Sequence, residues 1–185
     1  MTRRILVSGR ILLLWLGLSA LAVPAWAPMM ADEVARVEAA QWVDAQQIAS
    51  EYRIRLRQDS LRLTDSLAFL IVQAADRHAV PRRIAFRLIW AESRFKVNAK
   101  GTVGDAGLAQ VLPSTARRVC NVRDARRLYD PVTNLDCGFK YFSSLLRRYE
   151  NLEWFALVGY NRGPRIADSL KAQGLGYPER ILALQ

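Results

Sequence analysis

One carboxylate stands out as a side chain that could do acid–base chemistry. Glu92 follows Ile84 and Leu88 at intervals of four residues, so the three share one face of a helix that the pattern predicts from Pro81 to about Ser93. That face is otherwise apolar, so Glu92 is expected to be partly buried near the helix C-terminus. Burial and the negative end of the helix dipole both disfavour the charged form and raise the carboxyl pKa. A glutamate with a raised pKa can act as a general acid near neutral pH.

A glycine-rich loop follows this helix and closes on the polar Gln110. Its glycines, Gly101, Gly104 and Gly107, fall within seven residues and indicate positive φ or close backbone approach, as in a surface that lies against a ligand. A carboxylate at a helix end that faces such a loop predicts one wall of a cleft. From the pattern alone, the alternative is that Glu92 lies at the helix end only to reach water.

The first 27 residues predict an export signal. Three arginines precede an apolar run from Ile11 to Val23, which is too short to span a bilayer comfortably, and small residues follow it up to Ala27. We therefore expect a signal peptide at residues 1–27 and a periplasmic protein, with an uncleaved membrane anchor as the alternative.

The positive charge of the chain is spread along the sequence. The formal net charge of +10 falls to +7 without residues 1–27, which contain three arginines and no acids. Arginines occur in scattered pairs such as Arg82-Arg83 and Arg147-Arg148, whereas a nucleic-acid binder more often concentrates them on one element with interleaved aromatics. No nucleic-acid partner is expected, and a basic exported protein more naturally meets an anionic envelope polymer or membrane surface.

The two cysteines, Cys120 and Cys137, belong to a chain bound for an oxidising compartment. A disulfide is therefore expected, closing a loop of about 18 residues and contributing ~3 kcal/mol to stability. Two cysteines and the single histidine, His78, make no structural zinc site, and no metal or cofactor is expected. His78 ends a helical run, where it is expected to cap carbonyl groups.

The rest of the chain predicts helices and no alternating strand pattern, so the fold class is mainly α. Thr64 is the expected N-cap of one helix, and residues 121–131 form an arginine-rich connection. Further helices are expected over residues 32–57, 113–120, 134–150, 154–160 and 164–173. We divide the chain into the signal at 1–27, an N-terminal helical segment at 28–62 without an assigned partner face, and a main domain at 63–185.

Four short motifs occur in order between about Leu67 and Leu182. They are Glu92-Ser93 with Phe95 and Ala99; Gly104 to Gln110 with Pro113, Thr115 and Ala116; Asp130-Pro131 with Asn134-Leu135, Gly138 and Tyr141; and Tyr160-Asn161 with Gly163-Pro164. Together they resemble the catalytic domain of the soluble lytic transglycosylases, a goose-lysozyme-like family. Any one of them alone would be a weak signal.

The resemblance implies a lysozyme-like helical domain with the glycine-rich loop beside the catalytic helix. It also implies cleavage of the MurNAc–GlcNAc β-1,4 bond of peptidoglycan without water, which leaves a 1,6-anhydro sugar. Glu92 would protonate the glycosidic oxygen and then, as a carboxylate, take the proton from the sugar's own 6-hydroxyl. One carboxylate suffices because the substrate carries its nucleophile, whereas most glycosidases need two.

The resemblance also implies roles for other side chains. Ser93 would hydrogen-bond Glu92 and hold its orientation; the alternative is a simple polar residue at the helix end. Tyr160 would bond Glu92 or stack on a sugar face; the alternative is a core tyrosine. The residues implied to line the sugar subsites are Leu108, Gln110, Tyr160 and Asn161. Tyr177, in a tail that matches the family poorly, is expected to correspond to a further substrate-binding tyrosine near the acid. Ala109 stands where the family usually has methionine, which is expected to remove bulk from the cleft wall.

Two other functions stay open. A goose-type muramidase, which is a hydrolase, would need a second carboxylate to place water, and Asp105 is the candidate in the loop; otherwise Asp105 stabilises the turn beside Gly104. A non-catalytic peptidoglycan-binding module is the other alternative. The expected partners are peptidoglycan glycan strands and, as a hypothesis from the small size, envelope secretion or conjugation machinery. The protein is expected to be a monomer.

Overall fold

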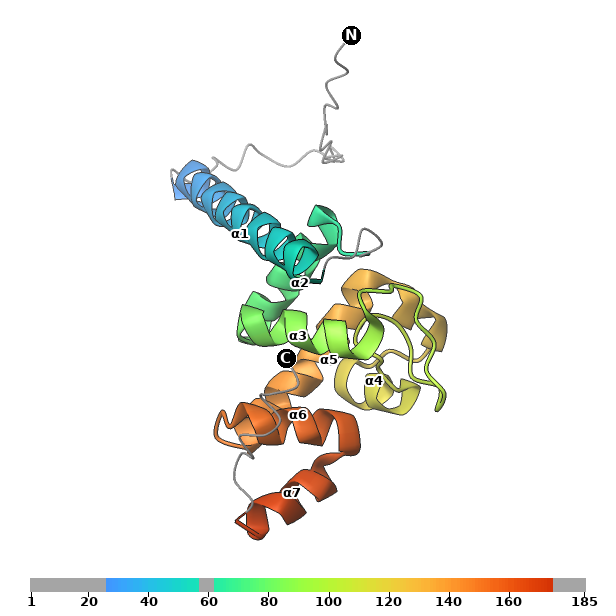
Figure 1. The fold of residues 1–185 in the computed structure, drawn as a ribbon. Helices are drawn as coiled ribbons and strands as arrows, with labels where there is room; N and C mark the ends of the chain where they lie inside the picture. Colours follow the sequence, from blue (N-terminus) through green and yellow to red (C-terminus); the bar gives the residue numbers. More distant parts are fainter. Residues whose placement is uncertain (1–25, 57–61, 175–185) are drawn as a thin grey trace, which may run out of the picture. The chain divides into compact units, whose positions relative to one another are not determined.

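The computed structural model describes residues 26–56 and 62–174, and within these ranges it forms seven α-helices and one short 3-10 helix (Figure 1). The chain divides into two units, residues 1–35 and 36–185, and the core belongs to the second. Extended pairing in the described ranges is limited to two isolated bridges within the glycine-rich loop. The expected α class is therefore confirmed. No helix in these ranges has both the length and the apolar character that a membrane span requires.

Most of the expected signal peptide lies outside the described residues, which start at Trp26. The helices are α1 (Trp26–Leu56), α2 (Asp65–Arg77), α3 (Arg82–Ser93), α4 (Pro113–Cys120), η1 (Ala125–Tyr129), α5 (Pro131–Arg148), α6 (Glu153–Arg162) and α7 (Pro164–Ala172). Local capping explains several boundaries. Thr64 caps α2 as expected, since its side chain accepts a hydrogen bond from the Leu67 amide at 3.1 Å. Helix α5 begins three residues before the expected Asn134, because Asp130 caps it through the Thr133 amide.

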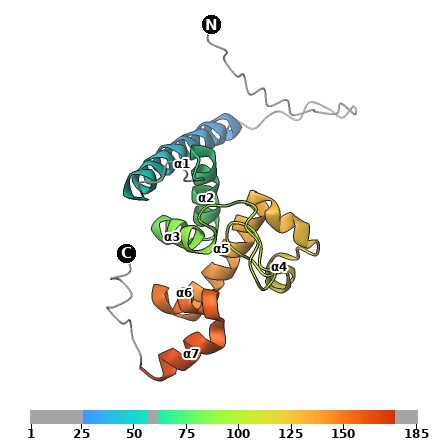
Figure 2. The ribbon, with the colours of Figure 1, turned by 45° about the vertical axis from the view of Figure 1, so that its right-hand side comes forward.

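Helix α5 is the element against which the others pack. It contacts α2, α4, α6 and η1, and it runs between α2 and α6 in both ribbon views (Figures 1 and 2). Its inward side chains include Leu135, Phe139 and Phe142, each fully buried. The expected disulfide is confirmed: Cys137 on α5 is joined to Cys120 at the end of α4, with their Cα atoms 5.6 Å apart.

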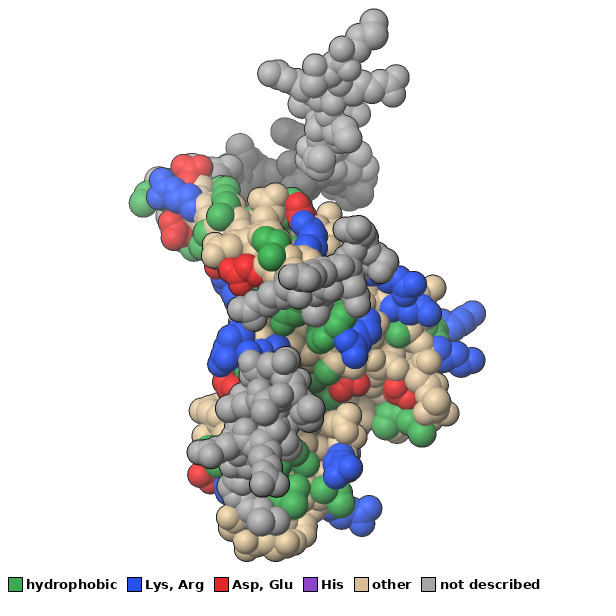
Figure 3. All heavy atoms as spheres, viewed as in Figure 1, with side chains coloured by type: hydrophobic (Ala, Val, Ile, Leu, Met, Phe, Trp, Pro, Cys, Tyr) green, Lys and Arg blue, Asp and Glu red, His purple; other side chains and the backbone are tan. Residues whose placement is uncertain are grey.

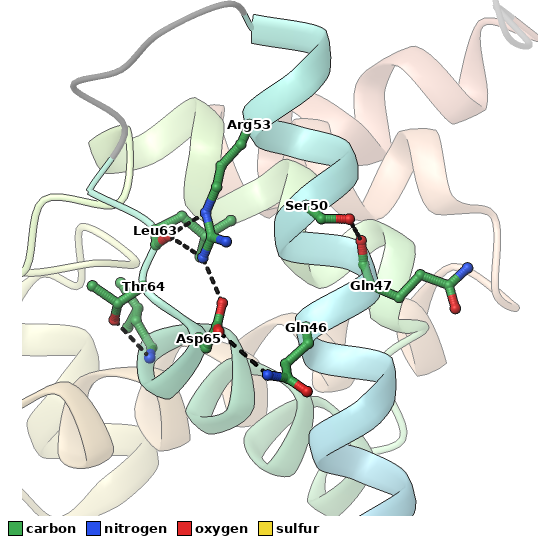
Figure 4. A network of polar contacts seen from close by, with 8 residues as sticks. Gln46, Gln47, Ser50, Arg53, Leu63, Thr64 and Asp65 are labelled. Carbon is green, nitrogen blue, oxygen red and sulfur yellow. Dashed lines mark hydrogen bonds and ion pairs between the residues drawn. The ribbon is translucent and has the colours of Figure 1, made fainter. Parts of the chain in front are cut away.

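The part of α1 that lies in the second unit packs into the same core. Ala45 and Ala49 have no exposed surface and belong to the core cluster of the main domain. Arg53 donates to the Leu63 carbonyl at 3.0 Å and pairs with Asp65 at 2.6 Å. Figure 4 shows both contacts between α1 and the start of α2. The segment that the sequence left without a partner face is thus held by the start of α2.

His78 departs from its expected role. The backbone amide of this residue, and not its side chain, caps α2 by donating to the Ala74 carbonyl at 3.2 Å. The imidazole Nε2 instead lies 2.8 Å from a carboxylate oxygen of Asp136 on α5. The expectation that the ring caps carbonyl groups was wrong, because an acidic partner 58 residues away in sequence packs against the helix end.

The basic side chains do not form a single patch on the face seen in Figure 3. Lys and Arg side chains lie there in separate groups, with apolar and neutral surface between them. Some arginines form ion pairs with carboxylates. For example, Arg82 pairs with Asp44 and Asp76, and Arg148 pairs with Asp168. The distribution agrees with the scattered arginine pairs of the sequence.

Candidate functional site

Glu92 lies in the last turn of α3 and is half-buried. The helix ends at Ser93 because Arg94 and Phe95 both adopt positive φ. The Phe95 ring then enters the core beside Phe86 and Trp90. Desolvation is the largest cause that raises the pKa of Glu92, and the negative charge of Asp105 adds to it. Together they bring the pKa from 4.5 to about 7. The carboxyl is therefore protonated in a large fraction of molecules near neutral pH.

The glycine-rich loop folds back on itself after α3. Ala106 and Val111 exchange backbone hydrogen bonds, and the Gly107 amide donates to the Ala99 carbonyl at 2.8 Å. The side-chain amide nitrogen of Gln110, Nε2, donates to the Gly107 carbonyl at 2.7 Å and to the Ala99 carbonyl at 3.3 Å. Gln110 therefore closes the loop, as its place in the sequence indicated. Its side-chain oxygen makes no hydrogen bond to another described residue and remains available to a ligand.

Two glycines of the loop are required for different reasons, and the difference gives a prediction. Gly104 and Gly107 have φ values of 90° and 77°. A Cβ at Gly104 would meet no atom within 4 Å, whereas a Cβ at Gly107 would collide with the Asn134 amide and the Leu128 carbonyl. We expect Gly107→Ala to destabilise the fold by about 2–4 kcal/mol, from backbone strain plus overpacking. Gly104→Ala should cost only the strain, about 1 kcal/mol.

Urea unfolding of the two alanine variants and the native protein measures this difference. Equal losses for Gly104→Ala and Gly107→Ala would mean that backbone conformation alone selects glycine at both positions, and would contradict the close approach of Asn134 to the loop.

Asn134 is the loop anchor that sequence reasoning did not assign. It is 1% exposed, and its amide nitrogen donates at 2.8 Å to the carbonyls of Ala106 and Leu128. Its side-chain oxygen accepts from the Ala109 amide at 2.7 Å. One side chain of α5 thus satisfies two backbone groups of the loop and one of η1. The available signal was a polar residue next to Leu135 on the buried side of an amphipathic helix, where an uncompensated amide would be costly.

Tyr160 ties α6 to the same loop. Its hydroxyl donates to the Ala109 carbonyl at 2.7 Å, and its ring packs against Tyr141 and Phe142 of α5. The hydroxyl is therefore bonded to the loop backbone and not to Glu92. Burial holds the pKa of the Tyr160 phenol well above its usual range, and the charge of Glu92 raises it further. The side chains of Tyr160 and Glu92 are therefore close enough to interact electrostatically.

Three other predicted residues lie deeper than a binding surface would require. The Ser93 hydroxyl is buried and donates to the Ile89 carbonyl at 3.1 Å, a bond within α3. Leu108 and Ala109 have no exposed surface. The expectation that Ala109 thins the cleft wall was wrong, because its methyl group packs inward beside Gly138 of α5. Leu108 supports the loop from within the core. The prediction for Tyr177 lies outside the described residues.

A pocket of about 310 Å³ opens beside the loop. It unites Gln110, Tyr160 and Asn161, three of the residues predicted to bind substrate. Glu92 is not among the residues that line it, although its charge acts on Tyr160. The complete lining is Gln110, Val111, Leu112, Thr115, Tyr141, Tyr160, Asn161, Arg162 and Gly163. Its hydroxyl, amide and aromatic side chains suit a neutral polar ligand such as a sugar. Within residues 26–56 and 62–174, no cluster of three or more His, Cys, Asp or Glu side chains could hold a metal ion.

The charge of Asp105 gives a prediction about Glu92. Asp105→Asn removes the Coulombic contribution and leaves the desolvation, so we expect the pKa of Glu92 to fall below about 7 while staying above 4.5. A carbon-13 NMR titration of the Glu92 carboxyl measures this shift directly. Glu150→Gln, at an exposed position, is the control and should leave the titration unchanged. An unchanged Glu92 titration in Asp105→Asn would contradict the electrostatic link.

Comparisons with known proteins agree with the motifs. The sequence profile of the family described as "Transglycosylase SLT domain" matches residues 69–175, more than half of the chain. The chain is 29% identical to the soluble lytic murein transglycosylase of Escherichia coli over 91 residues, which is 46% of this chain and 14% of that protein. It is 30% identical to the membrane-bound lytic murein transglycosylase C of Haemophilus influenzae over 164 residues, 76% of this chain and 44% of the relative. The chain thus spans less than half the length of these relatives.

A solved structure supports the fold. An inactive mutant of lytic transglycosylase Slt from Pseudomonas aeruginosa matches with a TM-score of 0.52 and 24% identity, over 54% of this chain and 17% of that one. At this identity the likeness concerns the fold alone, and it confirms the expected lysozyme-like helical architecture.

Proposed function

Because the chain belongs to the transglycosylase SLT domain family, we propose that it is a peptidoglycan lytic transglycosylase. It cleaves the MurNAc–GlcNAc β-1,4 bond without water and leaves 1,6-anhydroMurNAc ends. The observation that carries the proposal is the raised pKa of Glu92, about 7, at the glutamate of the family's Glu-Ser motif. The names of the two relatives described above, both lytic murein transglycosylases, support the same substrate.

Glu92 serves both halves of the reaction in turn. Its protonated carboxyl gives the proton to the glycosidic oxygen, and the bond between that oxygen and C1 of MurNAc breaks. The 6-hydroxyl oxygen of the same sugar then bonds to C1, and its proton passes to the Glu92 carboxylate, which restores the starting state. A pKa near 7 suits both steps, because neither protonation state is strongly disfavoured at neutral pH.

The pocket supplies the groups that would position the glycan strand. Gln110 and Asn161 offer amide groups to the hydroxyl and N-acetyl groups of the sugars, and Tyr141 and Tyr160 offer ring surface for packing. The bond from Tyr160 to Ala109 fixes the loop relative to α6, so the two walls keep their spacing. Ser93 remains a proposed positioning residue for Glu92, since its hydroxyl oxygen can accept a hydrogen bond while it donates to Ile89.

A hydrolase of the goose-lysozyme kind is the second candidate, and one observation favours it. Asp105 is close enough to raise the pKa of Glu92 by its charge, so a second carboxylate is near the acid. In an inverting hydrolase such a group would activate a water molecule. The first candidate needs no such water, because the 6-hydroxyl of the sugar is the nucleophile.

Digestion of purified peptidoglycan in water enriched in oxygen-18 separates these candidates. A lytic transglycosylase yields anhydro ends that contain no heavy oxygen, whereas a hydrolase yields reducing ends that contain one. Mass spectrometry of the released muropeptides reads both outcomes. Heavy reducing ends would overturn the proposal in favour of the hydrolase, and an absence of any new ends would favour a non-catalytic binding module.

The cellular setting is also a proposal. Export to the periplasm through a signal at residues 1–27 is supported by the arginines and apolar run of that segment. N-terminal sequencing of the protein recovered from the periplasm tests it, and a protein retained in the cytoplasm would contradict it.

We propose a monomer that acts on glycan strands and not on nucleic acid. Association with secretion or conjugation machinery rests on the small size alone, and a pull-down that recovers no such component would count against it.

A further inference from the structure

The pocket beside the loop carries one charged side chain. Arg162 is the sole ionisable lysine, arginine, aspartate or glutamate among the nine lining residues. It is exposed and makes no hydrogen bond or ion pair with another residue in the part of the chain that the structure describes. Other arginines of the same region differ in this respect: Arg148, for example, is held by Asp168 at 2.7 Å.

A second cavity shares the lining residues Arg162 and Gly163 with the first. It has a volume of about 700 Å³ and is lined by Arg162, Gly163, Pro164, Arg165 and Ile166. Arg162 therefore borders both cavities, and Arg165 adds a second guanidinium that likewise lacks a partner within the described ranges. Among the residues that the structure describes, no carboxylate lines either cavity. The charge of Arg118 also acts on Tyr141, a wall of the first pocket.

From this arrangement we propose that Arg162 and Arg165 form an anion subsite that binds a carboxylate of the peptide stem of peptidoglycan. The inference rests on the proposed function and extends it from the glycan to the stem. N-acetylated sugars carry no charge in the strand backbone, so the negative charge of the substrate lies on the peptide attached through the lactyl group of MurNAc. The neutral groups of the first pocket would hold the sugars, and the two arginines would hold the stem.

The chemistry fits guanidinium groups. Arginine binds carboxylates through paired N–H donors, and such charge-assisted hydrogen bonds are stronger than neutral ones. Because neither arginine is engaged by another described residue, the ligand carboxylate does not have to displace a protein carboxylate. Specificity for strands that still carry peptides would follow, since strands without peptides lack the carboxylates of the stem.

Binding measurements with a Glu92→Gln protein, in which turnover is blocked, test the proposal. Calorimetry is run with three probes: peptide-bearing glycan strands, the same strands after an amidase has removed the peptides and left the lactyl carboxylates, and a neutral hexamer of N-acetylglucosamine. We expect the combined Arg162→Ala and Arg165→Ala changes to weaken binding of peptide-bearing strands about 10-fold, equivalent to about 1.4 kcal/mol. Binding of the hexamer should change less than about 2-fold, and the salt dependence of the first probe should decrease.

Two further variants sharpen the result. Arg162→Lys keeps the charge but loses the paired donors, so an intermediate loss is expected. Arg123→Ala, at an exposed arginine that lines neither cavity, is the matched control and should bind all probes as the parent does. Thermal unfolding of each variant confirms that the fold is retained.

Each other outcome overturns the inference. An equal loss on stripped strands would assign the anion to the lactyl carboxylate, and an equal loss on the hexamer would show a general role in sugar binding. No loss on any probe would remove the subsite. If the anhydro products described above still form in that case, only this inference fails. If no probe binds the parent protein, the proposed function fails with it.

Discussion

Glu92→Gln is expected to reduce the rate of peptidoglycan cleavage at least ~10²-fold, because general acid–base catalysis contributes that much or more. Glutamine keeps the size and polarity of the side chain but can neither release a proton to the glycosidic oxygen nor take one from the 6-hydroxyl. The measurement is the clearance rate of a cell-wall suspension, with the released anhydro ends counted by mass spectrometry. Glu38→Gln, at an exposed glutamate of α1, should clear the suspension at the native rate. Equal rates for Glu92→Gln and native protein would show that Glu92 is not the acid.

Glu92→Gln is also expected to make the fold more stable at alkaline pH. This effect distinguishes a variant that has lost its catalytic acid from one that has lost its folded structure. The pKa of Glu92 is about 7 in the folded state and near 4.5 in the unfolded chain, so the unfolded state binds fewer protons between these values. Stability therefore falls as pH rises through this window. At pH 8 the native protein carries the full destabilisation, at most about 3 kcal/mol, and glutamine removes it. Melting curves should show a higher Tm for Glu92→Gln at pH 8 and little difference at pH 4.

Asn134→Ala is expected to produce the largest loss of stability, roughly 3–5 kcal/mol. The change leaves the Ala109 N–H and the Leu128 carbonyl without a hydrogen-bond partner, and each such group costs about 1–3 kcal/mol. The Ala106 carbonyl loses one of its two hydrogen bonds and keeps the one from the Val111 amide. The change also frees the loop at both Ala106 and Ala109, so the remaining folded protein should cleave more slowly. Urea unfolding measures the first effect, and the cell-wall assay at a temperature below the melting transition measures the second.

The control for Asn134 is another asparagine without such bonds. Asn98 is exposed and makes no side-chain hydrogen bond to another described residue, so Asn98→Ala should change stability by less than about 0.5 kcal/mol. A loss below about 1 kcal/mol in Asn134→Ala would mean that water replaces the three hydrogen bonds and that Asn134 does not anchor the loop.

The features that sequence predicted well have local causes. Thr64 marks the start of α2, and Pro113 and Pro164 mark the starts of α4 and α7, because a cap or a proline at a first turn acts within a few residues. The periodicity of Ile84, Leu88 and Glu92 likewise predicts a carboxyl on a buried face, and the raised pKa of Glu92 agrees with it.

The features that sequence missed depend on segments far apart in the chain. Tyr160 and Ala109 are 51 residues apart, Asn134 and Ala106 are 28 apart, and His78 and Asp136 are 58 apart. No local pattern states which backbone carbonyl a tyrosine will reach. The family motifs marked Asn134 and Tyr160 as residues of interest but did not reveal that both hold the loop. The roles expected for Ala109 and His78 failed for the same reason, since each is decided by a partner on α5.

The packing of α1 bears on how the protein can be produced. Tyr52 contacts Phe86 of α3 and Phe95, which follows the end of that helix. A shortened version that starts at α2 would open these aromatic groups to solvent and leave Arg82 without Asp44. Such a fragment should aggregate during expression even though every motif of the family is retained in it. The smallest useful recombinant product therefore keeps the second half of α1.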